Sequence, residues 1–384
     1  MYDNDKKTEE LLKQQVLEIM NEDKNSRINN KSSKKNKGKK KKKRILRYIG
    51  ISSLLILAML ILAIGTKPGR SIIYKTASKF VYSNINKGEP LKEEKEDFKH
   101  EKKSGNVVWE DYVYNFLIFG VEEIGGAKNT DAMLIGSINK KDGKIKLTSL
   151  LRDSYVDIPG YKANKLNSAF SKGGVDLLIE TIEKNYKIQI DGYAYVNFES
   201  FEKLVDMLGG VTIELGKEEA AYLNKTNYIS KKENRNVKPG VNKLNGNQVM
   251  GYVRVRKVKT LGGANYDYGR VVRQQRVLKA MFDSLMSTKN LFKIIPIGKQ
   301  ALSYVTTDLS QKQIEILMEA VIENKITTLE TSRIPVDGAF EAPKKYNGIG
   351  YPIILDWDKN LIEMYKFIFG YTEEEALAAL ERVK

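Results

Sequence analysis

The stretch Asn115–Phe170, NFLIFGVEEIGGAKNTDAMLIGSINKKDGKIKLTSLLRDSYVDIPGYKANKLNSAF, decides the fold of this chain. It contains three apolar runs with strand character, at Phe116–Phe119, Met133–Ile138 and Ile145–Leu151. Polar residues follow the strands, namely Glu122 and Glu123, Asn129-Thr130-Asp131, Arg152-Asp153 and Lys165-Leu166-Asn167. Acids and an arginine gathered at the ends of core strands are suited to hold a phosphate together with a metal ion.

Helical and extended patterns alternate through the rest of the chain. Periodicity predicts helices over 173–186 and 200–208 and strands over 193–198 and 211–215. Another strand is predicted over 326–335, and two closing helices over 356–369 and 373–383. This alternation indicates an α/β core with helices on both faces of a sheet. Whether the strands are parallel or mixed is left open by the spacing alone.

The composition restricts the chemistry. The chain has 384 residues, 41% of them apolar, and can bury one large core or two small ones. It has no cysteine, and its one histidine, His100, lies in a Lys- and Glu-rich stretch before the apparent domain. Disulfides, thiolate nucleophiles and Cys-based zinc sites are excluded, and His-based triads and zinc sites are not expected. Carboxylates, Arg, Lys, Tyr or hydroxyls must act instead, with an oxygen-binding cation such as Mg²⁺.

The positive charge is concentrated at the N-terminus. Of a net charge of +17, residues 1–47 contribute 16 Lys and Arg against 7 acids. We expect residues 1–44 to be a basic, disordered tail. Ile45–Ile64 follows, with one charge, at Arg47. A helix of that length spans roughly 30 Å, the hydrocarbon core of a bilayer, and the basic block before it should stay in the cytoplasm.

These features predict a single-pass protein of the cell membrane with a cytoplasmic N-terminus. The predicted organisation is a cytoplasmic tail (1–44), a transmembrane anchor (45–65), an extracellular stem (66–106), a catalytic domain (107–345) and a C-terminal helical extension (346–384) packed on or near that domain. A cleaved signal peptide is the alternative for the apolar segment, although the cationic head and apolar core exceed the usual pattern. A nucleic-acid arm is the less favoured alternative for the basic tail.

Arginines recur in regular positions further along the chain. Tyr252–Arg256 is predicted to be a strand, which places Arg254 and Arg256 on one face and Val253 and Val255 in the core. Arg270–Met286 is predicted to be a helix with Arg270, Arg273 and Gln274 on one side. Before these two segments, Glu218–Lys238 is polar and is expected to be an irregular surface excursion.

Together with Arg152, these arginines form a candidate polyphosphate site. Guanidinium groups present planar paired donors that fit phosphate oxygens. Asp131 and either Glu122 or Glu123 could hold a Mg²⁺ ion that bridges two phosphoryl oxygens. The alternative is that the arginines are ordinary surface residues of a basic domain. Two further alternatives stay open, since Lys165-Leu166-Asn167 could simply cap the next helix, and Asp153 could be a base or a partner of Arg152.

Five motifs in this order resemble the LytR-CpsA-Psr family. They are NFLIFGVEE, NTDAML, KIKLTSLLRDSYVDIP with KANKLNSAF, LNGNQVMGYVRVR and YDYGRVVRQQRVL, and they cover Asn115–Met286. The resemblance implies an α/β fold with a central mixed sheet, preceded by one transmembrane helix. It also implies an extracytoplasmic phosphotransferase that moves a glycopolymer (teichoic acid, capsule or similar) from polyprenyl pyrophosphate to peptidoglycan and leaves polyprenyl phosphate.

The resemblance also implies roles for individual residues. Asp131 is expected to be the principal metal-site acid, with Glu122 beside it and Mg²⁺, or Mn²⁺ in its place, as the ion. The expected pyrophosphate ligands are Arg152, Arg254, Arg256, Arg270, Arg273 and Gln274, with Lys165 added, and the expected catalytic residues are Asp131, Arg152, Arg254 and Arg256. The expected partners are the lipid-linked donor, peptidoglycan and the cytoplasmic membrane, and no nucleic acid.

Two positions depart from the family pattern. Glu122 stands where the family typically has Asp, and Asn129 stands where an Arg commonly precedes Ser/Thr-Asp. Metal affinity and donor preference are the properties that these two changes affect. Two other functions remain as alternatives, a hydrolase that releases the head group to water and a non-catalytic receptor for anionic polymer or lipid.

Overall fold

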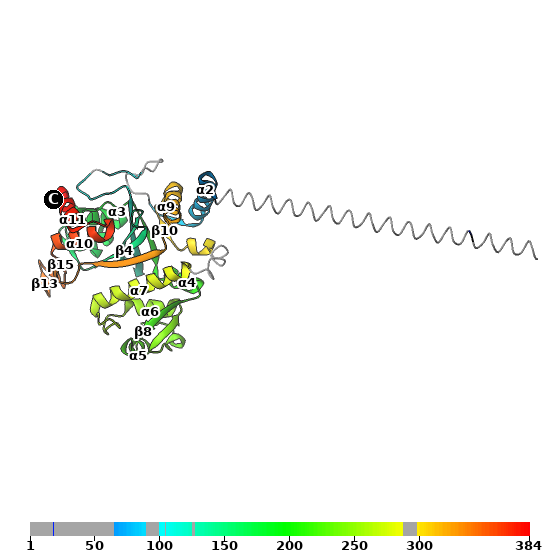
Figure 1. Cartoon of the computed structure of the whole chain (residues 1–384). Coiled ribbons are helices and arrows are strands. Elements are labelled where there is room, and N and C mark those ends of the chain that lie inside the picture. The colour runs from blue at the N-terminus through cyan, green and yellow to red at the C-terminus, as the bar shows by residue number, and fades with distance from the viewer. Residues whose placement is uncertain (1–17, 19–64, 90–99, 104, 125–126, 287–297) are drawn as a thin grey trace, which may run out of the picture. The chain divides into compact units, whose positions relative to one another are not determined.

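The computed structural model describes residue 18 and residues 65–89, 100–103, 105–124, 127–286 and 298–384 (Figure 1). The chain divides into two compact units, Met1–Ile73 and Tyr74–Lys384. The described end of the first unit contains the start of helix α2 (Lys67–Asn84). No helix in the described ranges is long and apolar enough to cross a bilayer. The predicted anchor at 45–64 lies outside these ranges, as does the predicted basic tail apart from residue 18.

A seven-stranded mixed sheet forms the centre of the second unit. Its strand order is β1–β10–β7–β2–β3–β4–β11. In that order the strands are Asn86–Lys87, Thr306–Thr307, Gly192–Asn197, Val113–Ile124, Ala127–Asn139, Lys144–Leu150 and Thr328–Ile334. β3 runs antiparallel to both β2 and β4, whereas β7 pairs with β2 and β11 pairs with β4 in parallel. The expected mixed α/β sheet is therefore confirmed.

Helices cover both faces of this sheet, because alternate residues of each strand point to opposite sides. Leu117 and Phe119 of β2 face a core shared with α3 (Asn167–Tyr186), α10 (Trp357–Phe369) and α11 (Glu373–Val383). On the other face, Phe116 packs against Ala320 of α9 (Gln311–Glu323), and Leu134 packs near Leu278 of α7 (Tyr266–Met286).

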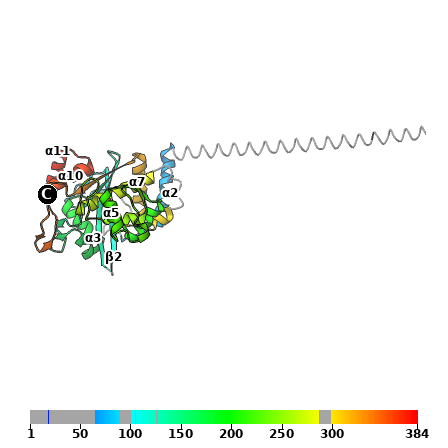
Figure 2. The same cartoon turned by 90° about the horizontal axis from the view of Figure 1, so that it is seen from below.

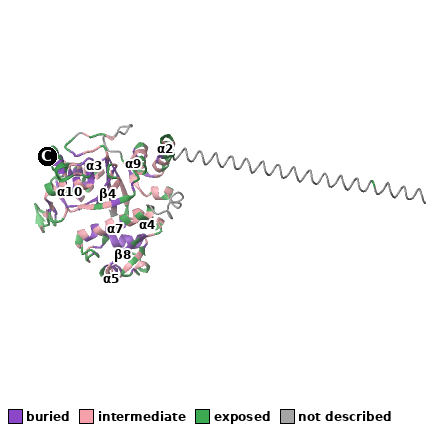
Figure 3. Ribbon diagram, viewed as in Figure 1, coloured by how far each residue is buried: buried purple, intermediate pink, exposed green. Residues whose placement is uncertain are grey.

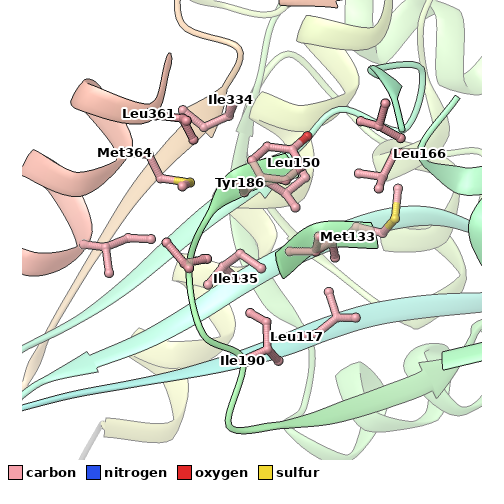
Figure 4. Close-up of a cluster of buried hydrophobic side chains, with 14 of the residues drawn as sticks. Leu117, Met133, Ile135, Leu150, Leu166, Tyr186, Ile190, Ile334, Leu361 and Met364 are labelled. Carbon is pink, nitrogen blue, oxygen red and sulfur yellow. The ribbon is translucent and has the colours of Figure 1, made fainter. Parts of the chain in front are cut away.

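The C-terminal helices belong to the main core. Figure 4 shows Leu361 and Met364 of α10 beside Ile334, in one buried cluster with Ile135, Met133 and Leu117 of the sheet. Each such buried side chain stabilises the fold by about 1.5–3 kcal/mol. The two closing helices predicted from the sequence are present within one residue of their expected bounds.

A second, smaller core packs against Val277, Ala280 and Met281 of α7 (Figures 2 and 3). It is built from α4 (Phe198–Met207), β8 (Val211–Leu215), α5 (Lys217–Lys225), β9 (Gly240–Leu244) and α6 (Gly246–Arg254). The predicted surface excursion at Glu218–Lys238 is therefore wrong in part. This polar segment contains most of α5 and a short helix, Lys232–Asn234. Ala220 and Leu223 of α5 are buried. Glu219 is also buried, because its charge is paired inside the protein.

The predicted strand at Tyr252–Arg256 is also wrong. Asn245 and Gln248 form a capping box, with Asn245 Oδ1 accepting from Gln248 N and Gln248 Oε1 accepting from Asn245 N. This cap starts α6, which continues to Arg254 before the backbone becomes extended at Val255. The expected burial still holds, because Val253 and Val255 are buried and Arg254 is exposed.

Short two-residue strands complete the structure near the site. They are β5 (Tyr155–Val156), β6 (Asn164–Lys165), β12 (Phe340–Glu341), β13 (Lys345–Tyr346), β14 (Ile349–Gly350) and β15 (Ile354–Leu355). β5 pairs with β6, β12 with β15, and β13 with β14, all antiparallel. The chain after β14 bonds directly to the segment that follows β4, since Ile353 N donates to Asp153 O and Tyr155 N donates to Ile353 O.

Candidate functional site

A pocket of about 390 Å³ opens between the sheet, α4, α6 and α7. Most of its wall is apolar, with Ile118, Leu134, Val196, Phe198, Phe201, Met250, Val253 and Leu278 among the lining residues. Its polar lining consists of Asp131, Arg254, Arg256, Lys257, Arg270 and Gln274. Five of the residues predicted from the sequence therefore meet at one cavity.

A β-bulge presents Asp131 to this pocket. In the β2–β3 ladder Gly120 pairs with Ala132 and Val121 pairs with Thr130, so Asp131 is the extra residue of β3. A bulge bends the strand and redirects the side chain at that position, which is a common device near active sites. The sequence predicts Asp131 at a strand end, whereas the structure places it inside β3 (Ala127–Asn139), at the bulge that directs its side chain.

Asp131 is held by two of the predicted arginines. Nη1 of Arg152 donates to Oδ1 of Asp131, and Nη1 of Arg270 lies 3.9 Å from Oδ2. Arg152 comes directly after Leu151 at the end of β4, and Arg270 lies in the first part of α7. Two segments more than a hundred residues apart thus converge on one carboxylate.

Asp153 joins Arg152 to Lys165. Lys165 Nζ lies 2.9 Å from Oδ1 of Asp153, and Arg152 Nε lies 3.5 Å from Oδ2. Burial alone would raise the pKa of Asp153, but the hydrogen bond from Lys165 and the charge of Arg152 lower it overall. Asp153 is therefore a charged partner that positions the two cations, and the ladder between β5 and β6 places Lys165 beside it.

Asp267, which is not among the residues predicted from the sequence, is a second carboxylate that contacts two cations. Its Oδ1 lies 3.2 Å from both Arg256 Nε and Arg270 Nη2, and its carboxyl group is within hydrogen-bonding reach of Asp153. Two signals pointed to it: an acid in the first turn of a helix, and an arginine three residues later. Asp267 links the arginine after α6 to the arginine in α7.

Arg254 occupies a more open position at the C-terminal end of α6. Its Nη2 lies 3.6 Å from Oε1 of Glu122, and its guanidinium lies 5.8 Å from the ring centre of Phe198. The side chain is 51% exposed. Arg254 can therefore bind an incoming anion with little rearrangement of the protein.

The cluster carries more positive than negative charge. Arg152, Arg254, Arg256, Arg270 and Lys165 face the carboxylates of Asp131, Asp153, Asp267 and Glu122. Burial lowers the pKa of Arg270 to about 10; Asp267 opposes this shift, and the nearby charges of Arg152 and Arg256 reinforce it. A bound anion would relieve this repulsion, which is the electrostatic property of a phosphate site.

Arg273 does not join the others, contrary to the expectation that it shares a side of the helix with Arg270 and Gln274. Nε, Nη1 and Nη2 of Arg273 donate to Glu219 Oε1, Val255 O and Val258 O. At about 100° per residue, Gln274 is turned one way from Arg270 and Arg273 the other way. Gln274 lines the pocket, whereas Arg273 is fully buried in the second core.

The carboxylates of Asp131 and Glu122 are too few to hold a metal ion alone and suit one that is also bound by a phosphate ligand. In the part of the chain that the structure describes, no group of three or more acidic or histidine side chains could hold a metal ion. Mg²⁺ commonly takes one or two carboxylates and completes its shell with phosphate oxygens and water. Asp131 and Glu122 lie on neighbouring strands, with Glu122 opposite Asn129, and supply that many carboxylates. Their donor set suits a shared protein–phosphate site.

Curated relatives match over different shares of the chain. Regulatory protein MsrR of Staphylococcus aureus is 33% identical over 198 residues, which cover 51% of this chain and 56% of MsrR. The chain therefore spans little more than half the length of that relative. Polyisoprenyl-teichoic acid–peptidoglycan teichoic acid transferase TagU of Oceanobacillus iheyensis is 31% identical over 270 residues, 68% of this chain and 77% of TagU.

Solved structures of TagT from B. subtilis share the fold. TagT bound to LIIa-WTA superimposes with a TM-score of 0.55 at 23% identity and covers 77% of this chain and 100% of TagT. TagT with bound octaprenyl pyrophosphate lipid gives a TM-score of 0.51 at 22% identity, with the same coverage of both chains. Residues 79–359 match the sequence profile of the LytR_cpsA_psr family, and the chain belongs to that family.

Proposed function

We propose that this chain is a membrane-anchored phosphotransferase that moves a glycopolymer from a polyprenyl-pyrophosphate carrier to peptidoglycan. One observation carries the proposal: the lining of a mostly apolar pocket also includes Asp131, Arg254, Arg256, Arg270 and Gln274. An isoprenoid chain needs an apolar wall, and a diphosphate needs charged donors, so the two kinds of lining residue match the two parts of the carrier. The name of TagU and the lipid in a TagT structure support the same substrate class.

In the proposed reaction a hydroxyl oxygen of the acceptor forms a bond to the phosphorus that carries the polymer. The bond from that phosphorus to the oxygen bridging the two phosphates breaks, the hydroxyl proton is lost, and polyprenyl phosphate leaves. Phosphoryl transfer depends on positioning and on neutralising charge, so arginines can provide most of the catalysis without a histidine.

The arrangement suggests different tasks for the arginines. Arg270 and Arg256 share Asp267 and are fixed in orientation before the donor binds. Arg152 is held between Asp131 and Asp153 and can exchange the Asp131 contact for a phosphate oxygen. Arg254 is exposed and pairs loosely with Glu122, which suits the first capture of the diphosphate.

We also propose that the enzyme works with Mg²⁺, or Mn²⁺ in its place, held by Asp131 and Glu122 together with the diphosphate. When bound, the ion would neutralise charge on the phosphoryl oxygens. Glu122 carries one more methylene group than aspartate, and its Oε1 lies 3.6 Å from Nη2 of Arg254, a residue of the pocket lining.

The proposed location is the outer face of the cytoplasmic membrane. The basis is the sequence of residues 31–64, in which a cationic block precedes twenty residues whose only charge is Arg47. A single-pass anchor of this orientation would keep the domain close to the lipid that carries its donor.

The test is transfer by the full chain, reconstituted in lipid bilayers, with a lipid-linked glycopolymer and purified peptidoglycan. We expect polymer covalently joined to peptidoglycan and one polyprenyl phosphate released for each transfer. Release of polymer phosphate to water at the same rate without peptidoglycan would instead identify a hydrolase. Donor binding without turnover would identify a receptor.

A further inference from the structure

Exposed tyrosines gather at one part of the structure. In the ranges that the structure describes, four tyrosine side chains are exposed: Tyr161, Tyr266, Tyr346 and Tyr351. Tyr161 lies between β5 and β6, Tyr346 and Tyr351 lie on and directly after the β13–β14 hairpin, and Tyr266 directly precedes Asp267. All four are thus on segments that adjoin Asp153, although the chain has 21 tyrosines.

Two of these tyrosines have an unfavourable backbone conformation. Tyr266 and Tyr351 have φ values of 50° and 52°, in the left-handed region, and each side chain is 71% exposed. Glycine or asparagine fits such positions better, because a β-carbon with a bulky ring is strained there. Burial of the ring does not compensate for this cost at either residue. Strained residues of this kind concentrate at binding and catalytic sites.

Backbone hydrogen bonds fix both tyrosines beside the charged cluster. Tyr266 N donates to Arg256 O, and the next residue, Asp267, contacts Arg270. Tyr351 N donates to Lys344 O, and two residues later Ile353 N donates to Asp153 O. Since two residues span at most roughly 7 Å, Tyr351 lies close to the Asp153 backbone.

The hairpin is also anchored through side chains. The ring of Tyr346 packs edge-on against Tyr155 at 5.2 Å between ring centres, and Asn347 Nδ2 donates to the hydroxyl of Tyr155. Tyr155 in turn pairs with Lys165 across the β5–β6 ladder. The tyrosine surface is defined as Tyr266, Tyr346 and Tyr351. Its hairpin part therefore adjoins the residues that hold Lys165 and Asp153, and Tyr266 adjoins the cluster through Arg256.

The acids beside this surface do not line the apolar pocket. Asp131, Arg256 and Arg270 line the pocket. Asp153 contacts Arg152 and Asp267 contacts Arg270, but neither acid lines the pocket. In a phosphoryl transfer the attacking and leaving oxygens are roughly in line. If the isoprenoid phosphate leaves toward the pocket, a hydroxyl guided past Asp153 and Asp267 would approach the arginines from outside the pocket.

We infer that the tyrosine surface binds the acceptor, a glycan strand, and guides its hydroxyl group toward the arginine cluster; this inference rests on the proposed transfer. Tyrosine rings stack on the apolar C–H faces of pyranose sugars, and their hydroxyl groups bond to sugar hydroxyls. Lys344 and Lys345 are exposed on the same hairpin and would attract carboxylates of an acidic glycan or its peptides.

The test compares the double variant Tyr266→Asn with Tyr351→Asn against Tyr266→Phe with Tyr351→Phe in the full chain. Asparagine tolerates the left-handed backbone and removes the ring, while phenylalanine keeps the ring. Val241→Asn, at an exposed apolar residue of β9, is the matched surface control. The probe is a soluble amino-sugar tetrasaccharide from glycan strands, titrated by NMR, with an isoprenyl pyrophosphate analogue titrated in the same samples.

We expect the Asn double variant to bind the tetrasaccharide about tenfold or more weakly, and to raise the acceptor KM by a similar factor. Its affinity for the pyrophosphate analogue and its kcat should stay within about twofold of the parent values. Such small changes would show that the substitutions leave the phosphate-binding residues undisturbed. Parent-like tetrasaccharide affinity in the Asn variant, or no binding by the parent, overturns the inference. If tetrasaccharide binding depends on the tyrosine rings but the parent transfers no polymer, the glycan-binding surface is supported and the proposed function is refuted.

Discussion

Nε of Arg273 lies 2.8 Å from Oε1 of Glu219, and both side chains are almost completely withdrawn from solvent, at 0% and 1% exposure. The same guanidinium donates to Val255 O at 3.0 Å and to Val258 O at 2.9 Å. These carbonyls flank Arg256. A buried ion pair in the second core therefore fixes the segment that presents Arg256 to the pocket.

Arg273→Ala should lower the free energy of unfolding by about 3–5 kcal/mol, because it leaves a buried carboxylate without a partner. Urea denaturation checks this value. Glu219→Gln should also be destabilising, because it leaves a buried guanidinium without its counter-charge. Combining Arg273→Met with Glu219→Leu should cost less than the sum of Arg273→Met and Glu219→Leu made singly. Single variants as stable as the parent would show that the pair does not hold the 255–258 segment.

Arg254→Ala should have the opposite profile, with little effect on folding and a large effect on transfer. The side chain is half exposed, so the free energy of unfolding should change by no more than about 0.5 kcal/mol. Loss of a charge contact to the transferring phosphoryl group should reduce kcat by about 10²–10³-fold. Lys259→Ala, an exposed cation on the same connecting segment, is the matched control. Transfer at the parent rate in Arg254→Ala would contradict the assignment.

The strands of the sheet were predictable from the sequence because their apolar runs are long and bounded by turn residues. The site was predictable in outline for the same reason, since Asp131 and Arg152 lie next to such runs, although Asp131 is inside β3 and not at its end. What the sequence does not encode locally is the bulge that aims Asp131, which depends on how β2 and β3 are paired.

The failures have a common cause in long-range contacts. Glu219 and Arg273 are 54 residues apart, so no spacing rule connects them, and a polar segment was taken for surface. The end of α6 is wrongly predicted as a strand, because its valine–arginine alternation resembles one, whereas the helix expected over Leu244–Met250 agrees with the start of α6 at the capping box of Asn245. The role of Asp267 becomes visible only when Arg256 and Arg270 are brought together.

Asp153 should make the free energy of unfolding depend on pH. Its pKa is lowered in the folded chain from an ordinary value of 3.8, so it stabilises the fold above that pH, and this stabilisation is lost as the pH falls through the folded value. Asp153→Asn removes the contribution. The difference in unfolding free energy between parent and variant should be constant at neutral pH and shrink below pH 3.8. Chemical denaturation over a pH series measures this difference. A difference that grows on acidification would contradict a lowered pKa for Asp153 in the folded chain.

Removal of divalent cations should abolish transfer, and Mg²⁺ should restore it, if Asp131 and Glu122 share an ion with the diphosphate. Glu122→Gln keeps the size of the side chain and removes its charge. We expect it to raise the Mg²⁺ concentration for half-maximal rate by about tenfold, since the ion favours charged oxygen ligands. Glu341→Gln, at an exposed acid of β12, is the control. Full activity in chelator would refute the requirement.

Val196→Trp should separate recognition of the lipid from recognition of the diphosphate. Val196 is a half-buried residue of β7 that lines the pocket, so a larger side chain there occupies space in the cavity of about 390 Å³. The KM for a long-chain polyprenyl donor should rise by about tenfold, equivalent to about 1.4 kcal/mol of lost binding.

Binding of inorganic pyrophosphate should be weakened much less than binding of the long-chain donor in Val196→Trp, because Val196 is an apolar part of the lining and the charged donors for phosphate are other residues. Val241→Trp, at an exposed position of β9, controls for the general effect of a new indole ring. Calorimetric titrations with pyrophosphate and with a long-chain analogue measure the two affinities separately. Equal losses for both ligands would place the lipid elsewhere, and no loss for either would show that the apolar wall does not contact the isoprenoid chain.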